Sequence, residues 1–139
     1  VQLVALAALM PIVASVGGNT GNQTATLIIR ALAQGRITRE NSLQLIRKEI
    51  SVGAINGVLL GLVVALFALI LYQDVHLSLV IAAAMLLTLV MAASLGFAVP
   101  VYLQKTGRDP ALGASVITTA VTDSIGFFIF LGLASLFLV

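Results

Sequence analysis

Four apolar runs, separated by three short connections that hold most of the charges, constrain what this chain can fold into more than any other feature. A helix needs about 20 largely apolar residues to cross the hydrocarbon core of a bilayer. The runs cover about residues 3–33, 50–72, 77–103 and 111–139. Hydrocarbon offers no water to backbone polar groups, so such runs fold as helices. We therefore predict an all-α polytopic membrane helix bundle, a single transmembrane domain over residues 1–139 with four spans.

The composition excludes most soluble functions. Charged residues make up 9% of the chain and hydrophobic residues 60%, whereas a soluble domain carries about 25% charged residues. The chain has no cysteine, which excludes disulfides and thiolate metal sites. Its pI near 9.5 would suggest nucleic acid in a soluble chain. Here the basic residues flank the spans, so we expect membrane lipid as a partner and no nucleic acid.

The basic residues also predict the orientation in the cell membrane. All seven Lys and Arg residues lie in or beside the first and third connections. The positive-inside rule assigns such connections to the cytoplasm. We therefore expect loops 34–49 and 104–110 to be cytoplasmic, and loop 73–76 and the C-terminus to lie outside.

The first cytoplasmic connection is patterned as an amphipathic helix over about residues 38–50. Thr38 can cap this helix, and Leu43, Leu45 and Ile46 supply its apolar side. A basic helix of this kind usually lies at the headgroup boundary, and we expect it to merge into the second span. Docking of a partner is the less favoured interpretation. Late in the third span, Pro100 is expected to bend or end the helix.

Amides and hydroxyls interrupt the first span at a depth where the bilayer offers no water. At about 100° per residue, Asn19, Asn22 and Thr26 fall on one narrow face. Unpaired amides in hydrocarbon cost several kcal/mol each, so this face must meet protein, water or an ion. We predict water and an ion. The residues expected to line or support this path are Asn19, Asn22, Gln23 and Thr26.

Glycines at four-residue spacing predict close helix packing, because a missing side chain lets a neighbouring helix approach. They are Gly17 and Gly21 in the first span and Gly53, Gly57 and Gly61 in the second. Asn56 lies beside the second set and is expected to bond across to a neighbouring helix.

Asp123 is the only acidic residue deep inside an apolar run. An ionised carboxylate there costs about 2.5–3.5 kcal/mol on insertion scales, and no Lys or Arg is expected at its level. A protonated, hydrogen-bonded Asp123 or a packing role are the alternatives; we favour a role with a cation or proton. Hydroxyls of Ser115, Thr119 and Thr122 lead toward the carboxylate along one face, although hydroxyls also bond back to the preceding turn.

The available ligands are all oxygen atoms, which suits hard cations such as Mg²⁺, Ca²⁺ and Mn²⁺. One carboxylate per chain is too few for a dehydrated cage, but Mg²⁺ loses its waters reluctantly and can be held through them. Two copies about a two-fold axis would supply two Asp123 carboxylates, matching a divalent charge. We therefore predict a homodimer with its path near the axis.

Two stretches, PIVASVGGNTGNQTATLIIRALAQGRI and DPALGASVITTAVTDSIGFFIFLGLA, resemble the transmembrane domain of MgtE magnesium channels and their solute-carrier relatives. The specific features are the GGNxGxQ run followed by IRALA and the DP…TxxxD…G ending. The resemblance implies the last four of the family's five spans, without the first span and the cytosolic N-terminal and CBS domains. Val1 opens inside an apolar run without signal-peptide features, as expected of a piece of a longer polypeptide.

The resemblance implies a homodimeric Mg²⁺-selective channel whose pore, on the dimer axis, is lined by the first and last spans present here. Asp123 matches the acid that holds hydrated Mg²⁺, the transported and bound ion, through its waters. One and two turns earlier the family uses a backbone carbonyl, typically of Ala, and an Asn side chain. These positions are Thr119 and Ser115 here. The carbonyl survives the substitution, whereas Ser is too short to reach as Asn does.

Three other functions differ from a channel in what they require of these residues. In a cation-coupled secondary transporter, a polar, Gly-interrupted span marks the midplane site, and Asp123 would bind the coupling ion or proton. An enzyme is not expected, because aspartyl chemistry needs a carboxylate pair and a Ser nucleophile needs a base. A purely structural subunit would leave the polar face and Asp123 without a reason.

Overall fold

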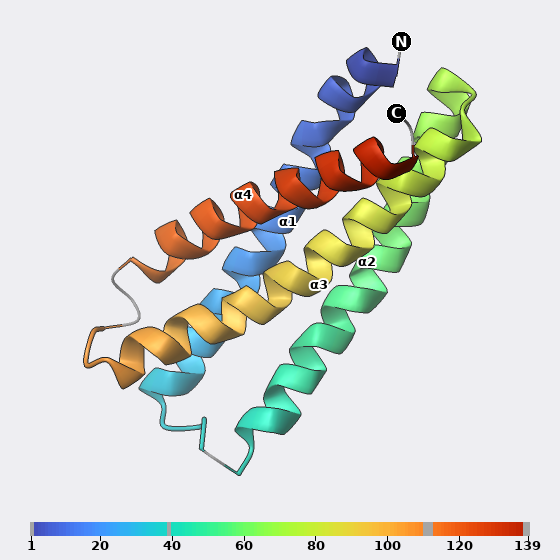
Figure 1. Ribbon diagram of the computed structural model, residues 1–139. Coiled ribbons are helices and arrows are strands. Elements are labelled where there is room, and N and C mark those ends of the chain that lie inside the picture. Colours follow the sequence, from blue (N-terminus) through green and yellow to red (C-terminus); the bar gives the residue numbers. More distant parts are fainter. Residues whose placement is uncertain (1, 39, 110–112, 138–139) are drawn as a thin grey trace.

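The computed structural model describes residues 2–38, 40–109 and 113–137, and these form a four-helix bundle in which consecutive helices run antiparallel (Figure 1). The helices are α1 (Gln2–Ala33), α2 (Ser42–Tyr72), α3 (Val75–Lys105) and α4 (Ala114–Phe137). The described ranges contain no strand. The predicted all-α fold is therefore confirmed.

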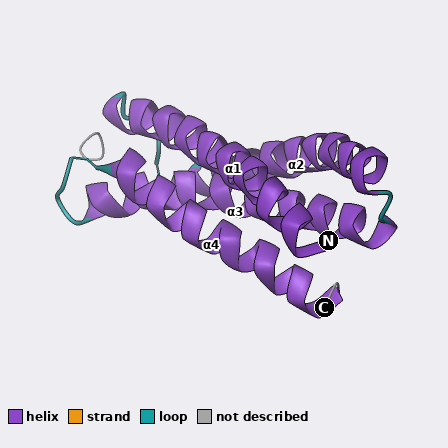
Figure 2. Ribbon diagram, turned by 90° about the horizontal axis from the view of Figure 1, so that it is seen from above, coloured by secondary structure: helices purple, strands orange, loops and turns teal. Residues whose placement is uncertain are grey.

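Helix α3 is the centre of the bundle. It packs against α1, α2 and α4; α1 also packs against α4, whereas α1 and α2 barely touch. Figure 2 shows the same arrangement from above. Fully buried Ile81, Met85 and Leu89 of α3 form the core with Val13 of α1 and Phe130 of α4. The apolar α3 is thus surrounded by protein, and the other three helices expose their outer faces.

Three of the described helices are long and apolar enough to cross a membrane: α2, α3 and residues 116–137 of α4. Large apolar side chains such as Leu62 and Phe67 are exposed on α2, each by 61%, as suits contact with lipid. Helix α1 has 32 residues, about 48 Å at 1.5 Å per residue, but it carries more polar residues than any of these three helices. Its crossing of the membrane stays a prediction.

The basic connections lie at one end of the bundle. The loops after α1 and after α3 lie at this end, while the α2–α3 turn lies at the opposite end together with the start of α1 and the end of α4 (Figure 1). This arrangement gives both basic loops the same side. Which side faces the cytoplasm remains the prediction of the charge pattern.

Helix α2 begins two turns earlier than the predicted second span. Residues 42–49 belong to one continuous helix that ends at Tyr72, so the amphipathic segment merges into the second span as expected, although it begins at Ser42 and not at about residue 38. Just before it, Thr38 N donates to Asn41 Oδ1 (2.7 Å) and Asn41 N donates to Thr38 Oγ1 (3.3 Å). This reciprocal pair resembles a capping box, but it closes the turn before α2, whose own N-cap, Asn41, makes no side-chain capping bond.

Helix α3 runs past Pro100 to Lys105, so Pro100 does not end the helix. The pyrrolidine ring is buried, and neighbouring helices make such prolines tolerable in membrane bundles. At its start, the Asp74 side chain accepts from Leu77 N at 3.2 Å. Helix α4 begins at Ala114; the predicted start at Ala111 lies outside the described residues.

The predicted close packing at the second-span glycines is confirmed. A Cβ added to Gly53 would lie 2.9 Å from Leu89 O, and one added to Gly57 would lie 2.9 Å from Leu86 Cα. The backbones of α2 and α3 are therefore in contact. The expectation for Asn56 was wrong: it is exposed and makes no hydrogen bond to a described residue, because it lies beside the buried stripe.

Candidate cation site and polar face

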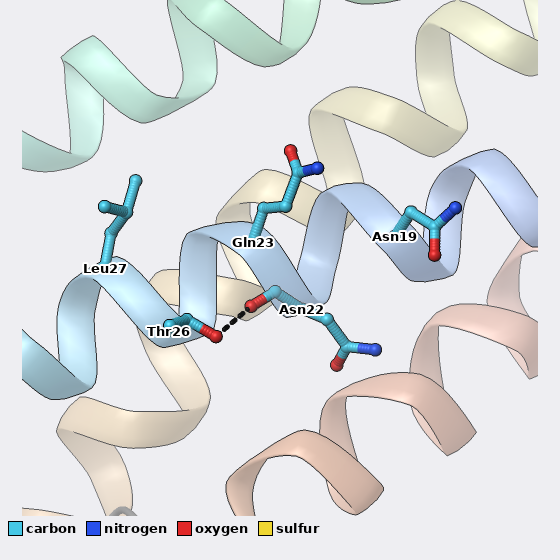
Figure 3. A pocket seen from close by; sticks show the side chains of 5 residues that line it. All are labelled: Asn19, Asn22, Gln23, Thr26 and Leu27. Atoms are coloured by element: carbon cyan, nitrogen blue, oxygen red, sulfur yellow. Dashed lines mark hydrogen bonds between the residues drawn. The ribbon is translucent and has the colours of Figure 1, made fainter.

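The polar side chains of α1 lie on the open surface of the single chain. Asn19, Gln23 and Thr26 are exposed, whereas Gly21 and Ala25 on the opposite side are buried. The exposed side chains line a shallow groove of about 480 Å³ (Figure 3). Its lining residues are Asn19, Asn22, Gln23, Thr26 and Leu27. We call this surface the polar face.

The amides of the polar face are largely unused by the protein. Thr26 Oγ1 donates to the Asn22 carbonyl at 2.8 Å, and the Asn22 side chain points toward α4, away from Gln23 (Figure 3). Within the described residues, the side chains of Asn19 and Gln23 make no hydrogen bond. Contact with lipid would cost several kcal/mol per amide, so this face suits water or a second protein surface.

The edge of the polar face meets α4 in a polar seam. Thr119 Oγ1 donates to Asn22 Oδ1 at 3.2 Å. One turn along both helices, Asp123 Oδ1 lies 3.7 Å from where a Cβ on Gly18 would be. The glycine lets the carboxylate lie against α1, and Asp123 stays partly exposed. The structure thus brings Asn22, Thr119 and Asp123 together.

Two other predicted site residues differ from this group. Thr122 is 1% exposed, and its Oγ1 lies 3.3 Å from the Cβ position of Gly21. It lies behind the seam, in the helix packing, where it can support the polar face but does not line it. Ser115 belongs to α4, and its side chain lies outside the described part of the chain.

Three buried hydroxyls at the junction of α1, α3 and α4 were not anticipated. Thr88, Thr118 and Thr122 are at most 1% exposed, and their Oγ1 atoms have no hydrogen-bond partner among the described residues. Their methyl groups lie beside Gly17 and Gly21; a Cβ added to Gly17 would lie 2.7 Å from Thr88 Cγ2, and one added to Gly21 would lie 3.0 Å from Thr118 Cγ2. The glycine spacing predicted a close neighbour here but could not identify it as threonine.

Glu49 is a second residue that the sequence analysis missed. It is 9% exposed, and its Oε2 accepts from Thr24 Oγ1 at 3.4 Å, linking α2 to α1. A signal for this burial exists in the sequence. Glu49 lies four residues before Gly53, so it continues the glycine stripe that was predicted to be buried.

The described residues contain no group of three His, Cys, Asp or Glu side chains that could hold a metal ion. The seam offers one carboxylate with amide and hydroxyl oxygens beside it. This set does not enclose a bare ion, but it can accept hydrogen bonds from the waters of a hydrated one. Mg²⁺ suits such a site, because it keeps several of its waters in proteins.

Comparison with known proteins agrees with this chemistry. The MgtE family, described as divalent cation transporter, matches residues 10–133. The chain is 38% identical over 138 residues to magnesium transporter MgtE of Thermus thermophilus and 30% identical over 137 residues to that of Bacillus subtilis. The alignments cover 96% and 99% of this chain and 30% of each relative. The chain therefore spans less than a third of the length of these relatives.

Proposed function

The chain belongs to the MgtE family of divalent cation transporters, and on this premise we propose that it forms the ion-conducting part of a magnesium transporter. The observation that carries the proposal is the exposed polar face of α1 beside Asp123, on a bundle whose other outer faces are mostly apolar, although Asn56 is an exposed amide on α2. The relatives named magnesium transporter MgtE support Mg²⁺ as the transported ion.

The proposed pore lies between two copies of the chain. A face with unpaired amides cannot border hydrocarbon, whereas two such faces across a two-fold axis would enclose water. The α1–α4 seam would then line the path from both sides. Two Asp123 carboxylates would balance the charge of one divalent cation. The surrounding lipid would contact the apolar outer faces.

Conduction in this arrangement depends on keeping the ion hydrated. Removing the tightly held water of Mg²⁺ is costly, and neither Asn19 nor Gln23 offers a negative charge in exchange. These amides can both donate to and accept from water. Asp123 would hold the ion through its waters, strongly enough to admit it and weakly enough to release it. The Asn22–Thr119 hydrogen bond would fix the wall beside it.

Ion flux into sealed vesicles tests this function. The reconstituted protein is expected to admit Mg²⁺ down its electrochemical gradient without a gradient of Na⁺ or protons. Mn²⁺, Co²⁺ and Ca²⁺ measured in the same vesicles give the selectivity. Flux that requires a counter-ion would favour cation-coupled secondary transport, with Asp123 as the coupling site. Absence of divalent flux would contradict both.

The orientation is tested by labelling a single cysteine, since the chain has none of its own. Gln73→Cys, in the exposed turn between α2 and α3, is expected to react with an impermeant thiol reagent from outside only. Gln34→Cys, exposed after α1, is the matched control and should react only from the cytoplasmic side. The reverse pattern would overturn the assignment of both basic loops to the cytoplasm.

A further inference from the structure

We propose that the chain binds the phosphate headgroup of an anionic phospholipid in a pocket between the end of α1 and the start of α2. The pocket has a volume of about 450 Å³ and combines cationic, amide and apolar side chains. Its lining residues are Leu27, Ala31, Arg36, Asn41, Gln44, Leu45, Lys48 and Glu49. The proposal does not depend on ion conduction.

The charge that this pocket presents is positive. Arg36 and Lys48 are exposed, and neither forms an ion pair with a described residue. Glu49 also contributes to the lining, but it is 9% exposed and bonded to Thr24 on the protein side. An arriving phosphate therefore meets two accessible cations and one largely buried carboxylate, whose Oε2 accepts a hydrogen bond from Thr24.

The position of the pocket favours a lipid over a free anion. Leu27, Ala31 and Leu45 form an apolar wall beside the cations, which a free phosphate would not use and a glycerol backbone would cover. The apolar run of α2 begins at Ile50, half a turn after Lys48. The cations thus lie at the level where a span meets the headgroups, where a basic pocket between helices is suited to an acidic lipid.

The pocket is held in shape by its own loop. Arg36 N donates to Ala31 O at 2.9 Å, and Asn41 Nδ2 donates to Arg36 O. The same Asn41 side chain accepts from Thr38 N at 2.7 Å. The backbone that carries Arg36 is therefore fixed before any ligand arrives. The first turn of α2, which borders the pocket, adds the positive end of its helix dipole.

Lipid titration of the purified, delipidated protein in detergent tests the proposal. Binding of phosphatidylglycerol and of phosphatidylcholine with the same acyl chains is measured by native mass spectrometry. We expect at least tenfold tighter binding of phosphatidylglycerol. In the double variant Arg36→Gln/Lys48→Gln this preference should fall below about threefold, because each basic residue near the surface contributes about 1 kcal/mol to such binding.

The matched control is Arg47→Gln/Lys105→Gln, which removes two exposed cations at the same end of the bundle but outside the pocket. It should keep the full preference, and both double variants should keep the elution volume and Tm of the starting protein. Equal loss in both variants would mean a diffuse charge effect and would overturn the site.

Two further outcomes would also overturn the proposal. If millimolar inorganic phosphate bound the pocket as tightly as phosphatidylglycerol and displaced it, the pocket would be a site for free anions. A change in oligomeric mass of the Arg36→Gln/Lys48→Gln variant, with unchanged lipid preference, would identify the pocket as a contact between copies. The variant Arg36→Lys provides the last check. It keeps the positive charge, so it should also keep the preference for phosphatidylglycerol over phosphatidylcholine.

Discussion

Asp123→Asn is expected to lower Mg²⁺ flux at least tenfold while leaving the fold intact. The substitution keeps the size of the side chain and its place against Gly18 but removes the negative charge. Two unit charges about 4 Å apart interact by about 4 kcal/mol at an effective dielectric of about 20, and a tenfold change in rate requires only about 1.4 kcal/mol. Flux into vesicles, with Tm measured on the same preparation, provides the test.

Two variants make the result specific. Asp109→Asn removes an exposed carboxylate in the loop before α4 and should leave flux within about twofold, since exposed charges are screened beyond a Debye length of about 8 Å. Asp123→Glu keeps the charge and should retain more flux than the Asn variant. Normal flux in Asp123→Asn would remove the proposed role of this carboxylate.

Gly96→Ala is expected to destabilise the bundle, because the added methyl group has no room between α3 and α1. A Cβ at this position would lie 2.7 Å from Gly21 O and 2.7 Å from Thr24 Cβ. A backbone oxygen cannot rotate away, so α1 and α3 must separate, at a cost of about 1–3 kcal/mol for an overpacked site. The Tm of the variant in detergent should fall by several degrees.

Gly132→Ala, in the last third of α4, is the control for this experiment. Nothing lies within 4 Å of its Cβ position, and replacing Gly by Ala inside a helix stabilises it by about 0.5–1 kcal/mol. Its Tm should therefore hold or rise. If the Tm of Gly96→Ala matched that of the starting protein, the close approach of α1 to α3 would be contradicted.

The fold followed closely from periodicity and composition. The apolar runs became helices, and both glycine stripes lie in contacts between helices: Gly53 meets α3, while Gly17 meets Thr88 and Thr122. The polar residues of α1 also lie together on one side, as the helical angle requires. These features depend on the order of residues within one segment, which is what a sequence displays directly.

The parts that could not be predicted depend on how one helix faces another. The angular pattern of α4 placed Thr119 and Thr122 on one face, whereas the packing directs Thr119 to Asn22 and buries Thr122. The same limit hid the contact between Thr24 and Glu49. A charged residue near a helix end is usually exposed to solvent, so only the four-residue spacing from Glu49 to Gly53 could have indicated that Glu49 is buried.

Helix α2 has a single extensive protein neighbour, α3, among the described helices. Most of its circumference is not covered by the other described helices, so we expect its inclination to follow the thickness of the hydrocarbon layer, with the glycine contacts as the pivot. The polar seam lies on the far side of α3 and is insulated from that tilt. If the polar seam conducts ions as proposed, adjustment to bilayer thickness and passage of ions would involve different helices of this chain.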